Sequence, residues 1–359
     1  MADIRIAFRV DASNEIGAGH VMRCLILAEA LRQIRCQCFF ICSNMDGNLI
    51  GYIESKNFEV IVLNDKFKNA KGETSFSGKW LLGTWEQDAR DTCNAIQKLE
   101  ASWIVVDHYG IDARWERVVR ETGRRVMVID DIGDRSHDCQ FLLVPSISLD
   151  TEEIYRTAPN AGKILIGPKY IFIRPEFSDL TLQRQRSGEI KKILVYMGSN
   201  DVMNQAGKAL TALEGIPNIE VKALIGNHHP FEAELIACQS DSIEVMKTTP
   251  AMWELMAWAD LALGACGQAA WERCALGLSA IVVINAENQR RETIVLDSEG
   301  VVNSIGDSGV VQTEDWFKSV MNLIDNPLDV RRMSEDSLQL SGAWKNAVPE
   351  VVDTLLFYE

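Results

Sequence analysis

The chain has 359 residues, of which 47% are hydrophobic and 24% charged, and its 36 Lys+Arg against 51 Asp+Glu give a formal charge of −15. These proportions are typical of folded proteins and exclude long disordered regions, and the length suggests two domains. The acidic balance argues against nucleic acid and against anionic membrane surfaces as partners, because both require a basic face.

The first half of the chain alternates apolar runs with helical patterns. Such alternation predicts an α/β domain with a parallel sheet and helices on both faces. The expected strands lie at residues 5–10, 38–42, 58–63, 103–107, 124–130 and 141–145, and the expected helices at about 21–33, 88–99 and 113–121.

The same pattern restarts at about Ile190 with KKILVYMG and continues in further αβ units to about Val302. Between the halves lies PKYIFIRPEFSDLTLQRQRSGE, whose prolines and polar run are typical of a connector. We therefore expect an N-terminal Rossmann-like domain at 1–172, a linker at 173–190 and a C-terminal Rossmann-like domain at 191–359. Alternatively, the helical stretch at 316–359 packs back across the first domain.

Ligands of parallel α/β sheets bind at the carboxyl ends of the strands. Two such domains facing each other would enclose a cleft, which is the GT-B-like arrangement of many nucleotide-sugar enzymes. Because a fold does not determine a function, the loops at the strand ends have to decide the chemistry.

The chain carries no apolar run of the roughly 18–20 residues that a membrane span requires. Asp3 and Arg5 interrupt the first apolar run, which is therefore unlike a signal peptide. The nine cysteines contain no CxxC pair, and the closest group (Cys36, Cys38 and Cys42) is better explained by buried thiols than by a metal. These features predict a cytoplasmic protein with no membrane partner.

The first strand is followed by a glycine loop, DASNEIGAGH, that runs from Asp11 to His20. Gly17 and Gly19 allow a tight turn and a close approach of the backbone to a ligand, and the following helix start favours negative charge. NAD and ATP fit poorly, because the third glycine of G-x-G-x-x-G would fall at Met22 and no Walker A loop is present. We expect Asp11, Gly17 and Gly19 to bind substrate. A neutral His20 at the helix start is suited to activate water or a hydroxyl, although a capping or exposed histidine is the alternative.

Two glycine loops in the second half have a similar form. Gly198 and Ser199 follow a strand in an arrangement that resembles an anion nest, and Gly267 and Gln268 form a second strand-to-helix turn. Glu272 follows on that helix, where its carboxylate could accept hydrogen bonds from vicinal ribose hydroxyls. The alternative is that Glu272 pairs with a neighbouring arginine such as Arg273 or Arg290. All four loop residues and Glu272 are expected to bind substrate.

Two further polar clusters lie at the ends of apolar strands. One is the run from Asp107 to Gly110, which includes Tyr109. The other is Asp130 and Asp131 with His137 nearby, whose spacing matches no template for metal ligands. We therefore expect neither a metal site nor a cofactor.

Seven segments together resemble the nucleotide-sugar hydrolases of pseudaminic acid biosynthesis, the UDP-2,4-diacetamido-2,4,6-trideoxy-β-L-altropyranose hydrolase family. They are FRVDAS…IGAGHVMRCLILA, VVDHYGID, DDIGDRSHDC, IGPKYIFIRPEF, MGSND, GACGQAAWERCALGL and AENQRRET. The resemblance implies a GT-B fold, metal-independent water attack at the anomeric carbon, and UDP held mainly by the C-terminal domain. Water directed by a residue on the face opposite the leaving group is expected to invert the anomeric configuration. The resemblance also implies that His20 is the catalytic histidine, Tyr109 and Asn288 the tyrosine and asparagine of the cleft, and Glu272 the ribose-binding glutamate.

The chain departs from that family at three places. Ser199 replaces a glycine of the usual G-G-[ST]-D loop, Gln268 and Ala269 stand in a normally serine-rich stretch, and VPSISLD replaces a more polar segment. These changes concern the sugar more than the nucleotide or the mechanism.

Three functions are compatible with these features. In the first, His20 activates water to release UDP from a UDP-diacetamido-trideoxy sugar, within flagellin or surface-polysaccharide glycosylation. In the second, a GT-B glycosyltransferase uses His20 to deprotonate a soluble acceptor. The third is a nucleotide-sugar binding module without catalysis, in which His20, Tyr109 and Asn288 would have no role. The first is the interpretation that the motifs favour.

Overall fold

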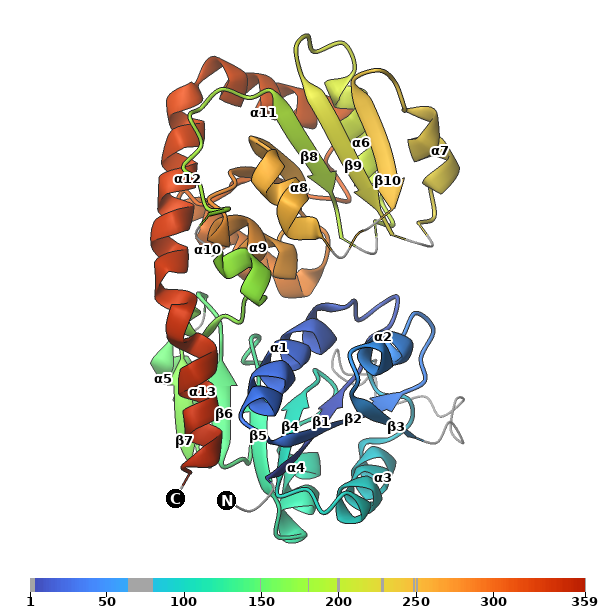
Figure 1. The fold of residues 1–359 in the computed structure, drawn as a ribbon, viewed down its shortest axis with the longest axis vertical. Coiled ribbons are helices and arrows are strands. Elements are labelled where there is room, and N and C mark those ends of the chain that lie inside the picture. The colour runs from blue at the N-terminus through green and yellow to red at the C-terminus, as the bar shows by residue number, and fades with distance from the viewer. Residues whose placement is uncertain are drawn as a thin grey trace. The chain divides into compact units, whose positions relative to one another are not determined.

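The computed structural model describes residues 4–63, 80–148, 150–179, 181–198, 201–226, 229–247, 249 and 251–358. The chain divides into two compact units, whose elements are labelled in Figure 1. The first comprises Met1–Phe172 with Asn346–Glu359, and the second comprises Ile173–Lys345. None of the helices in these described ranges is long and apolar enough to cross a membrane.

The first unit is built on a seven-stranded parallel sheet in the order β3-β2-β1-β4-β5-β6-β7. Its strands are β1 (Arg5–Val10), β2 (Gln37–Ser43), β3 (Glu59–Leu63), β4 (Trp103–Asp107), β5 (Arg125–Ile129), β6 (Phe141–Val144) and β7 (Lys163–Ile166). Its helices are α1 (Gly19–Gln33), α2 (Ile50–Ser55), α3 (Trp85–Lys98), α4 (Ala113–Glu121), α5 (Thr151–Thr157) and α13 (Ala347–Leu356).

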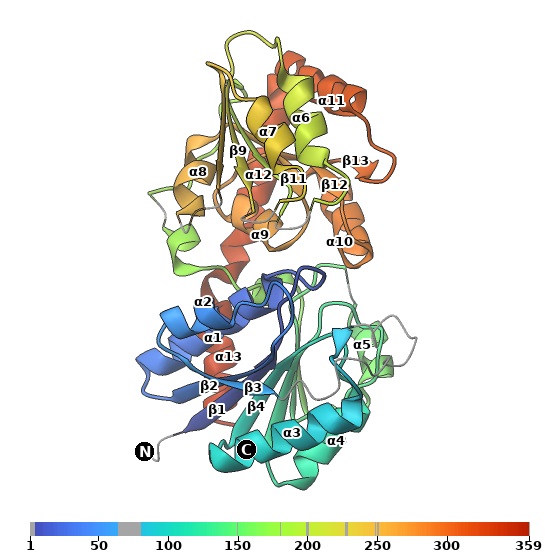
Figure 2. The same ribbon diagram turned by 90° about the vertical axis from the view of Figure 1, so that its right-hand side faces the viewer.

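Both faces of this sheet are covered, so its strands are apolar almost throughout. Alternation of side chains sends Phe8 of β1 to one face of the sheet and Ala7 to the other. Helices α1, α2 and α13 cover the first face, and α3 and α4 cover the second (Figure 2). The strand order reverses between β1 and β4, and the crevice at such a point is where ligands bind in open α/β sheets. The loops after β1 and β4 are the ones singled out by the sequence.

The second unit repeats this design with six parallel strands in the order β10-β9-β8-β11-β12-β13. Its strands are β8 (Lys192–Tyr196), β9 (Glu220–Ile225), β10 (Ile243–Lys247), β11 (Leu261–Ala265), β12 (Ala280–Ile284) and β13 (Asn303–Asp307). Its helices are α6 (Gln205–Leu213), α7 (Glu232–Ala237), α8 (Met252–Trp258), α9 (Gln268–Ala275), α10 (Glu287–Ser298), α11 (Thr313–Asp325) and α12 (Pro327–Ser341). Here the order reverses between β8 and β11, again at two glycine-containing loops.

The structure differs from the expected domain limits at two places. Residues 346–359 belong to the first unit rather than the second, because Val351 and Leu355 of α13 pack into the core that contains Phe8. The segment 173–190, expected to be a linker, is part of the second unit. A short 3-10 turn at Pro175–Ser178 and buried side chains such as Phe177 and Arg186 replace the extended connector that its prolines and polar residues suggested.

Arg186 is the main anchor of that segment and is fully buried. Its guanidinium donates to the carbonyl oxygens of Arg184, Met256, Ala259 and Leu276, and its backbone N–H donates to Ser334 Oγ. No carboxylate of the described residues lies within ion-pair distance of it. Backbone carbonyls therefore provide the hydrogen bonds that compensate this buried cation, which ties residues 184–186 to α8, α9 and α12.

We predict that Arg186→Leu lowers the free energy of unfolding of the second unit by at least about 3 kcal/mol, because several buried carbonyls lose their donor at once. Urea unfolding followed by circular dichroism measures the change. Arg331→Ala, which removes an exposed Arg331–Glu335 pair, is the control and should change stability by less than about 0.5 kcal/mol. Equal effects of the two substitutions would contradict the anchoring role of Arg186.

Candidate active site

The loop after β1 ends in a helix start whose backbone amides are not capped by a side chain. Helix α1 begins at Gly19 with Ala18 as its N-cap and no side-chain cap. Gly17 has φ +80°, a backbone conformation that side chains disfavour, and a Cβ at Gly17 or Gly19 would meet open space. The backbone is thus approachable at both glycines, as expected from the sequence, while their contact with substrate stays a prediction.

His20 lies in the first turn of α1 and pairs with Asp107, the last residue of β4. Its Nδ1 atom lies 2.6 Å from Asp107 Oδ1, and both side chains are buried. The pair forms because β1 and β4 are neighbours, with Val10 opposite Asp107. Since the carboxylate is an acceptor, we assign the ring proton to Nδ1. The other ring nitrogen, Nε2, then remains as a proton acceptor, with no hydrogen-bond partner in the described part of the chain.

Arg23 holds the same carboxylate from one turn further along α1. Its Nε lies 2.5 Å from Asp107 Oδ2 and its Nη2 lies 2.7 Å from Oδ1. Burial alone would raise the pKa of Asp107, but the Arg23 cation outweighs it and, with His20, keeps the pKa well below its usual range. Asp107 therefore stays ionised, which fixes the orientation of the His20 ring. Arg23 was not predicted as a site residue, although its i, i+3 spacing from His20 places both side chains on one face of the helix.

Tyr109 completes this group from the loop after β4. Its hydroxyl donates to Asp131 Oδ1 at 2.9 Å, and its ring packs edge-on against His20 with 4.4 Å between ring centroids. Asp131 also accepts from Arg23 Nη1. The structure thus brings the predicted residues His20 and Tyr109 together within the first unit, and adds Asp107, Arg23 and Asp131 around them.

Asp11 lies elsewhere, in a second buried cluster under the same loops. Its carboxylate pairs with Arg9 at 2.8 Å and accepts from the Ser43 amide at 2.6 Å. His108 also donates to it through Nε2, because His108 Nδ1 accepts from the Gly110 amide. Burial opposes ionisation of Asp11, but Arg9 and His108 hold its pKa well below the usual range. Asp11 is thus enclosed by protein partners, so it shapes the loops rather than presenting a free carboxylate.

A third buried cluster contains Asp130 and His137, the two ends of the second polar run. Each ring nitrogen of His137 contacts a carboxylate. His137 Nδ1 lies 2.7 Å from Glu116 and Nε2 lies 3.2 Å from Asp130. Burial disfavours the charged ring, but Glu116 and Asp130 outweigh it and raise the pKa of His137 to about 9. Within the described residues no group of three His, Cys, Asp or Glu side chains is arranged to hold a metal ion.

In the second unit, the loop after β8 uses one of its own side chains to cap the helix that follows, α6. Gly198 has φ +92°, and Ser199 lies outside the described residues. Asp201 is buried and accepts from the amides of Gln205 and Ala206 at 2.8 and 2.7 Å. These bonds cap α6, so its first amides are not free for an anion. The anion nest that the sequence suggested around Gly198 is therefore not built on this helix start.

The starts of α9 and α10 differ from α6, because neither has a side-chain cap. Gly267 is the N-cap of α9 and Gln268 its first residue, while Asn288 lies in the first turn of α10. A Cβ at Gly267 would lie 3.5 Å from Gln289 Nε2, so the two helix starts are close. Asn285, before α10, donates to the carbonyl of Met197 at 3.0 Å. Four predicted residues thus gather at one edge of this sheet: Gly198, Gly267, Gln268 and Asn288.

Glu272 is buried on α9 and pairs with Arg174, not with Arg273 or Arg290. Arg174 Nε donates to Glu272 Oε1 at 2.8 Å. Burial raises the pKa of Glu272 although Arg174 opposes the shift, and Arg290 instead pairs with Glu287 and Asp307. Arg174 was missed because it falls in the expected linker, where the motif IRPEF was its only signal.

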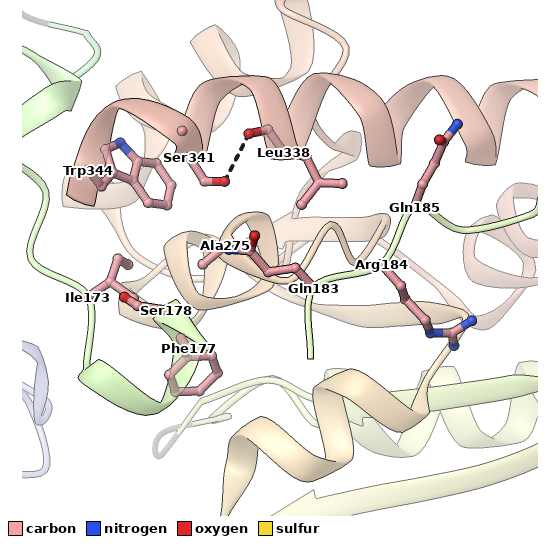
Figure 3. Close-up of a pocket in the computed structure, with 11 residues that line it drawn as sticks. Ile173, Phe177, Ser178, Gln183, Arg184, Gln185, Ala275, Leu338, Ser341 and Trp344 are labelled. Atoms are coloured by element: carbon pink, nitrogen blue, oxygen red, sulfur yellow. Dashed lines mark hydrogen bonds between the residues drawn. The ribbon is translucent and has the colours of Figure 1, made fainter. Parts of the chain in front are cut away.

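A cavity of about 340 Å³ lies in the second unit between Ala275, the last residue of α9, and Leu338 and Ser341 of α12 (Figure 3). None of the predicted site residues lines this cavity. The lining residue Phe177 has the Arg174 guanidinium over its ring, 4.7 Å from the ring centre. The residues that line it are Ile173, Phe177, Ser178, Gln183, Arg184, Gln185, Ala275, Leu338, Ser341, Gly342 and Trp344.

Part of the chain matches a known domain family, and the chain is similar to curated proteins at low sequence identity. Residues 193–339 match the glycosyltransferase family 28 C-terminal domain. UDP-2,4-diacetamido-2,4,6-trideoxy-β-L-altropyranose hydrolase of Campylobacter jejuni is 24% identical, over 56% of this chain and 62% of that protein. Spore coat polysaccharide biosynthesis protein SpsG of Bacillus subtilis is 23% identical over 87% of this chain and 86% of that protein.

The fold is also found in solved structures. The crystal structure of MurG from Acinetobacter baumannii is 15% identical and aligns over 98% of this chain and 99% of its own, with a TM-score of 0.64. Two parallel-sheet α/β units with such neighbours confirm the GT-B fold class expected from the sequence.

The carboxylate contacts of His137 predict a pH-dependent stability. Folding raises the pKa of His137 from 6.5 to about 9, so the folded protein binds this proton more tightly. That stabilisation is complete below pH 6.5 and is lost as the pH rises through 9. We expect the melting temperature of the wild type to fall relative to that of His137→Gln between pH 6.5 and 9, as measured by calorimetry. Parallel pH curves for the two proteins would show that His137 does not carry this proton.

Proposed function

We propose that this protein hydrolyses a UDP-linked diacetamido-trideoxy sugar, UDP-2,4-diacetamido-2,4,6-trideoxy-β-L-altrose, into free sugar and UDP. The observation that carries the proposal is the His20–Asp107 pair, with Nδ1 fixed at 2.6 Å from a buried carboxylate and Nε2 without a described partner. The similarity to the Campylobacter jejuni hydrolase supports the substrate class. The similarity to a protein of spore coat polysaccharide biosynthesis supports a role in surface glycosylation.

In this mechanism His20 acts as a general base toward water. Nε2 takes a proton from the water molecule while its oxygen forms a bond to the anomeric carbon. The C–O bond to the diphosphate breaks, its electron pair leaves with UDP, and the configuration at the anomeric carbon inverts. Asp107 holds the ring in the acceptor tautomer and stabilises the imidazolium that forms. Tyr109, packed against the ring, would position the water or the sugar.

UDP is assigned to the second unit. The uncapped amides at the starts of α9 and α10 offer donors and a positive dipole end for the diphosphate, whose negative charge grows as the bond breaks. Glu272 would accept hydrogen bonds from the ribose hydroxyls, and Asn288 at the start of α10 would contact the sugar. No residue of this set needs a metal or an organic cofactor to perform these roles.

A glycosyltransferase is the second candidate, because the family 28 match and the MurG likeness both come from that class. The same base would then deprotonate a hydroxyl of a soluble acceptor instead of water. Product analysis with and without candidate acceptors separates the two, since a transferase releases UDP at a useful rate only when an acceptor is present.

Substitutions separate catalysis from binding. His20→Gln should lower kcat by roughly 10²–10⁴-fold, the usual contribution of a general base, and leave UDP affinity near that of the wild type. Glu272→Gln should instead weaken UDP binding, because an amide accepts fewer hydrogen bonds than a carboxylate. Steady-state kinetics and calorimetric titration with UDP give the two quantities. Weakened UDP binding with an intact kcat in His20→Gln would refute the base assignment.

Isotope labelling identifies the bond that breaks. In H₂¹⁸O, attack at the anomeric carbon places the label in the free sugar and none in UDP, as read by mass spectrometry. Attack at phosphorus would label the nucleotide product or yield UMP and a sugar phosphate. Either of the latter results would replace the proposed mechanism with a pyrophosphatase-type reaction.

A further inference from the structure

We propose that Asp131 is a positioning residue for His20. It balances the charge around His20 through Arg23, and it holds the Tyr109 ring against His20 by accepting a hydrogen bond from the Tyr109 hydroxyl. This inference rests on the proposed function, because it concerns how His20 accepts a proton. Its support is independent of sequence similarity and comes from the contacts in the first unit.

The contacts form a closed chain of five side chains. His20 bonds to Asp107, Asp107 accepts from Arg23, Arg23 reaches Asp131, and Asp131 accepts from the Tyr109 hydroxyl. The Tyr109 ring returns to His20 through the edge-on contact at 4.4 Å. Asp131 is the least buried of the three charged members, with 20% of its side chain exposed against 11% for Arg23 and none for Asp107.

Charge counting shows why the second carboxylate matters. With a neutral His20, the two carboxylates and one guanidinium leave one net negative charge, and uptake of a proton by His20 brings the set to neutrality. Arg23 alone would already neutralise Asp107, so without Asp131 the same proton would create a buried positive charge. Such uncompensated charge is costly in a site that is mostly excluded from water.

Other nearby charges do not replace Asp131. The Arg135 guanidinium lies 5.6 Å from the Tyr109 ring centre, but it is already paired with Asp130 and Asp134 at 3.1 and 2.8 Å. Asp130 in turn accepts from the Ile132 and Gly133 amides and contacts His137. Asp131 is therefore the carboxylate whose charge reaches the base through Arg23.

Asp131→Asn tests this role with little change in shape, since an amide oxygen can still accept from Tyr109. We expect kcat for the UDP-sugar to fall about 10- to 100-fold, the range typical of partners that orient a reacting group. KM and the affinity for UDP should change less than about twofold. Asp112→Asn is the matched control: Asp112 is a 25% exposed partner of Arg114 and the N-cap of α4, and asparagine caps equally well. An unchanged kcat in Asp131→Asn would overturn the proposal.

A double substitution distinguishes positioning from general stability. If Asp131 acts through the base, Asp131→Asn should lower kcat no further in the His20→Gln background, because the group it serves is gone. A merely structural role would produce the full decrease in both backgrounds, together with a lower melting temperature. That second pattern would also overturn the proposal.

A spectroscopic measurement tests the coupling without any substrate. The His20 Nδ1 proton, in its short bond to Asp107, should give a far-downfield proton NMR signal, assigned by its loss in His20→Gln. This signal should shift in Asp131→Asn and stay in place in Asp112→Asn, and an unshifted signal in Asp131→Asn would count against the coupling. If the wild type releases no UDP from the sugar nucleotide, the proposed function fails, whereas the NMR comparison still decides whether Asp131 acts on His20.

Discussion

A fully buried carboxylate, Asp107 at the end of β4, is the group on which the candidate site depends. An isolated charge in this position would be very costly, so it must be compensated from nearby. Helix α1 supplies both partners, His20 and Arg23, from consecutive turns. The same contacts that make Asp107 tolerable therefore fix the start of α1, the orientation of the histidine ring and, through Asp131, the place of Tyr109.

The two units use one design for different purposes. Each places two loops at the point where its strand order reverses, between β1 and β4 in one and between β8 and β11 in the other. In the first unit these loops carry the His20–Asp107 pair and are supported by buried ion pairs such as Arg9 with Asp11 and Asp88. In the second unit the α9 and α10 starts keep their amides free of side-chain caps, which suits an anionic ligand better than a proton transfer.

Under the proposed mechanism, hydrolysis and glycosyl transfer would differ mainly in the molecule that gives its proton to His20 Nε2. Water and an acceptor hydroxyl could each do so, and the His20–Asp107 pair is therefore compatible with either class of enzyme. In the first unit the group beside His20 is Tyr109, whose ring is held by the hydrogen bond of its hydroxyl to Asp131 and by its edge-on contact with the His20 ring. Asp131 is in turn held by Arg23, so the position of this aromatic ring depends on both residues.

The sequence by itself determined the elements that depend on local pattern. Alternating apolar runs gave two parallel sheets, and the glycines at 17, 19, 198 and 267 marked the loops at the strand ends, because periodicity and backbone freedom are local properties. Long-range pairing was decided only by the tertiary structure. Three findings join residues far apart in the chain: Asp11 is enclosed by Ser43 and His108, Glu272 meets Arg174 from the expected linker, and α13 returns to the first unit. Buried charges take whichever partner the packing brings within reach, and no local pattern encodes that choice.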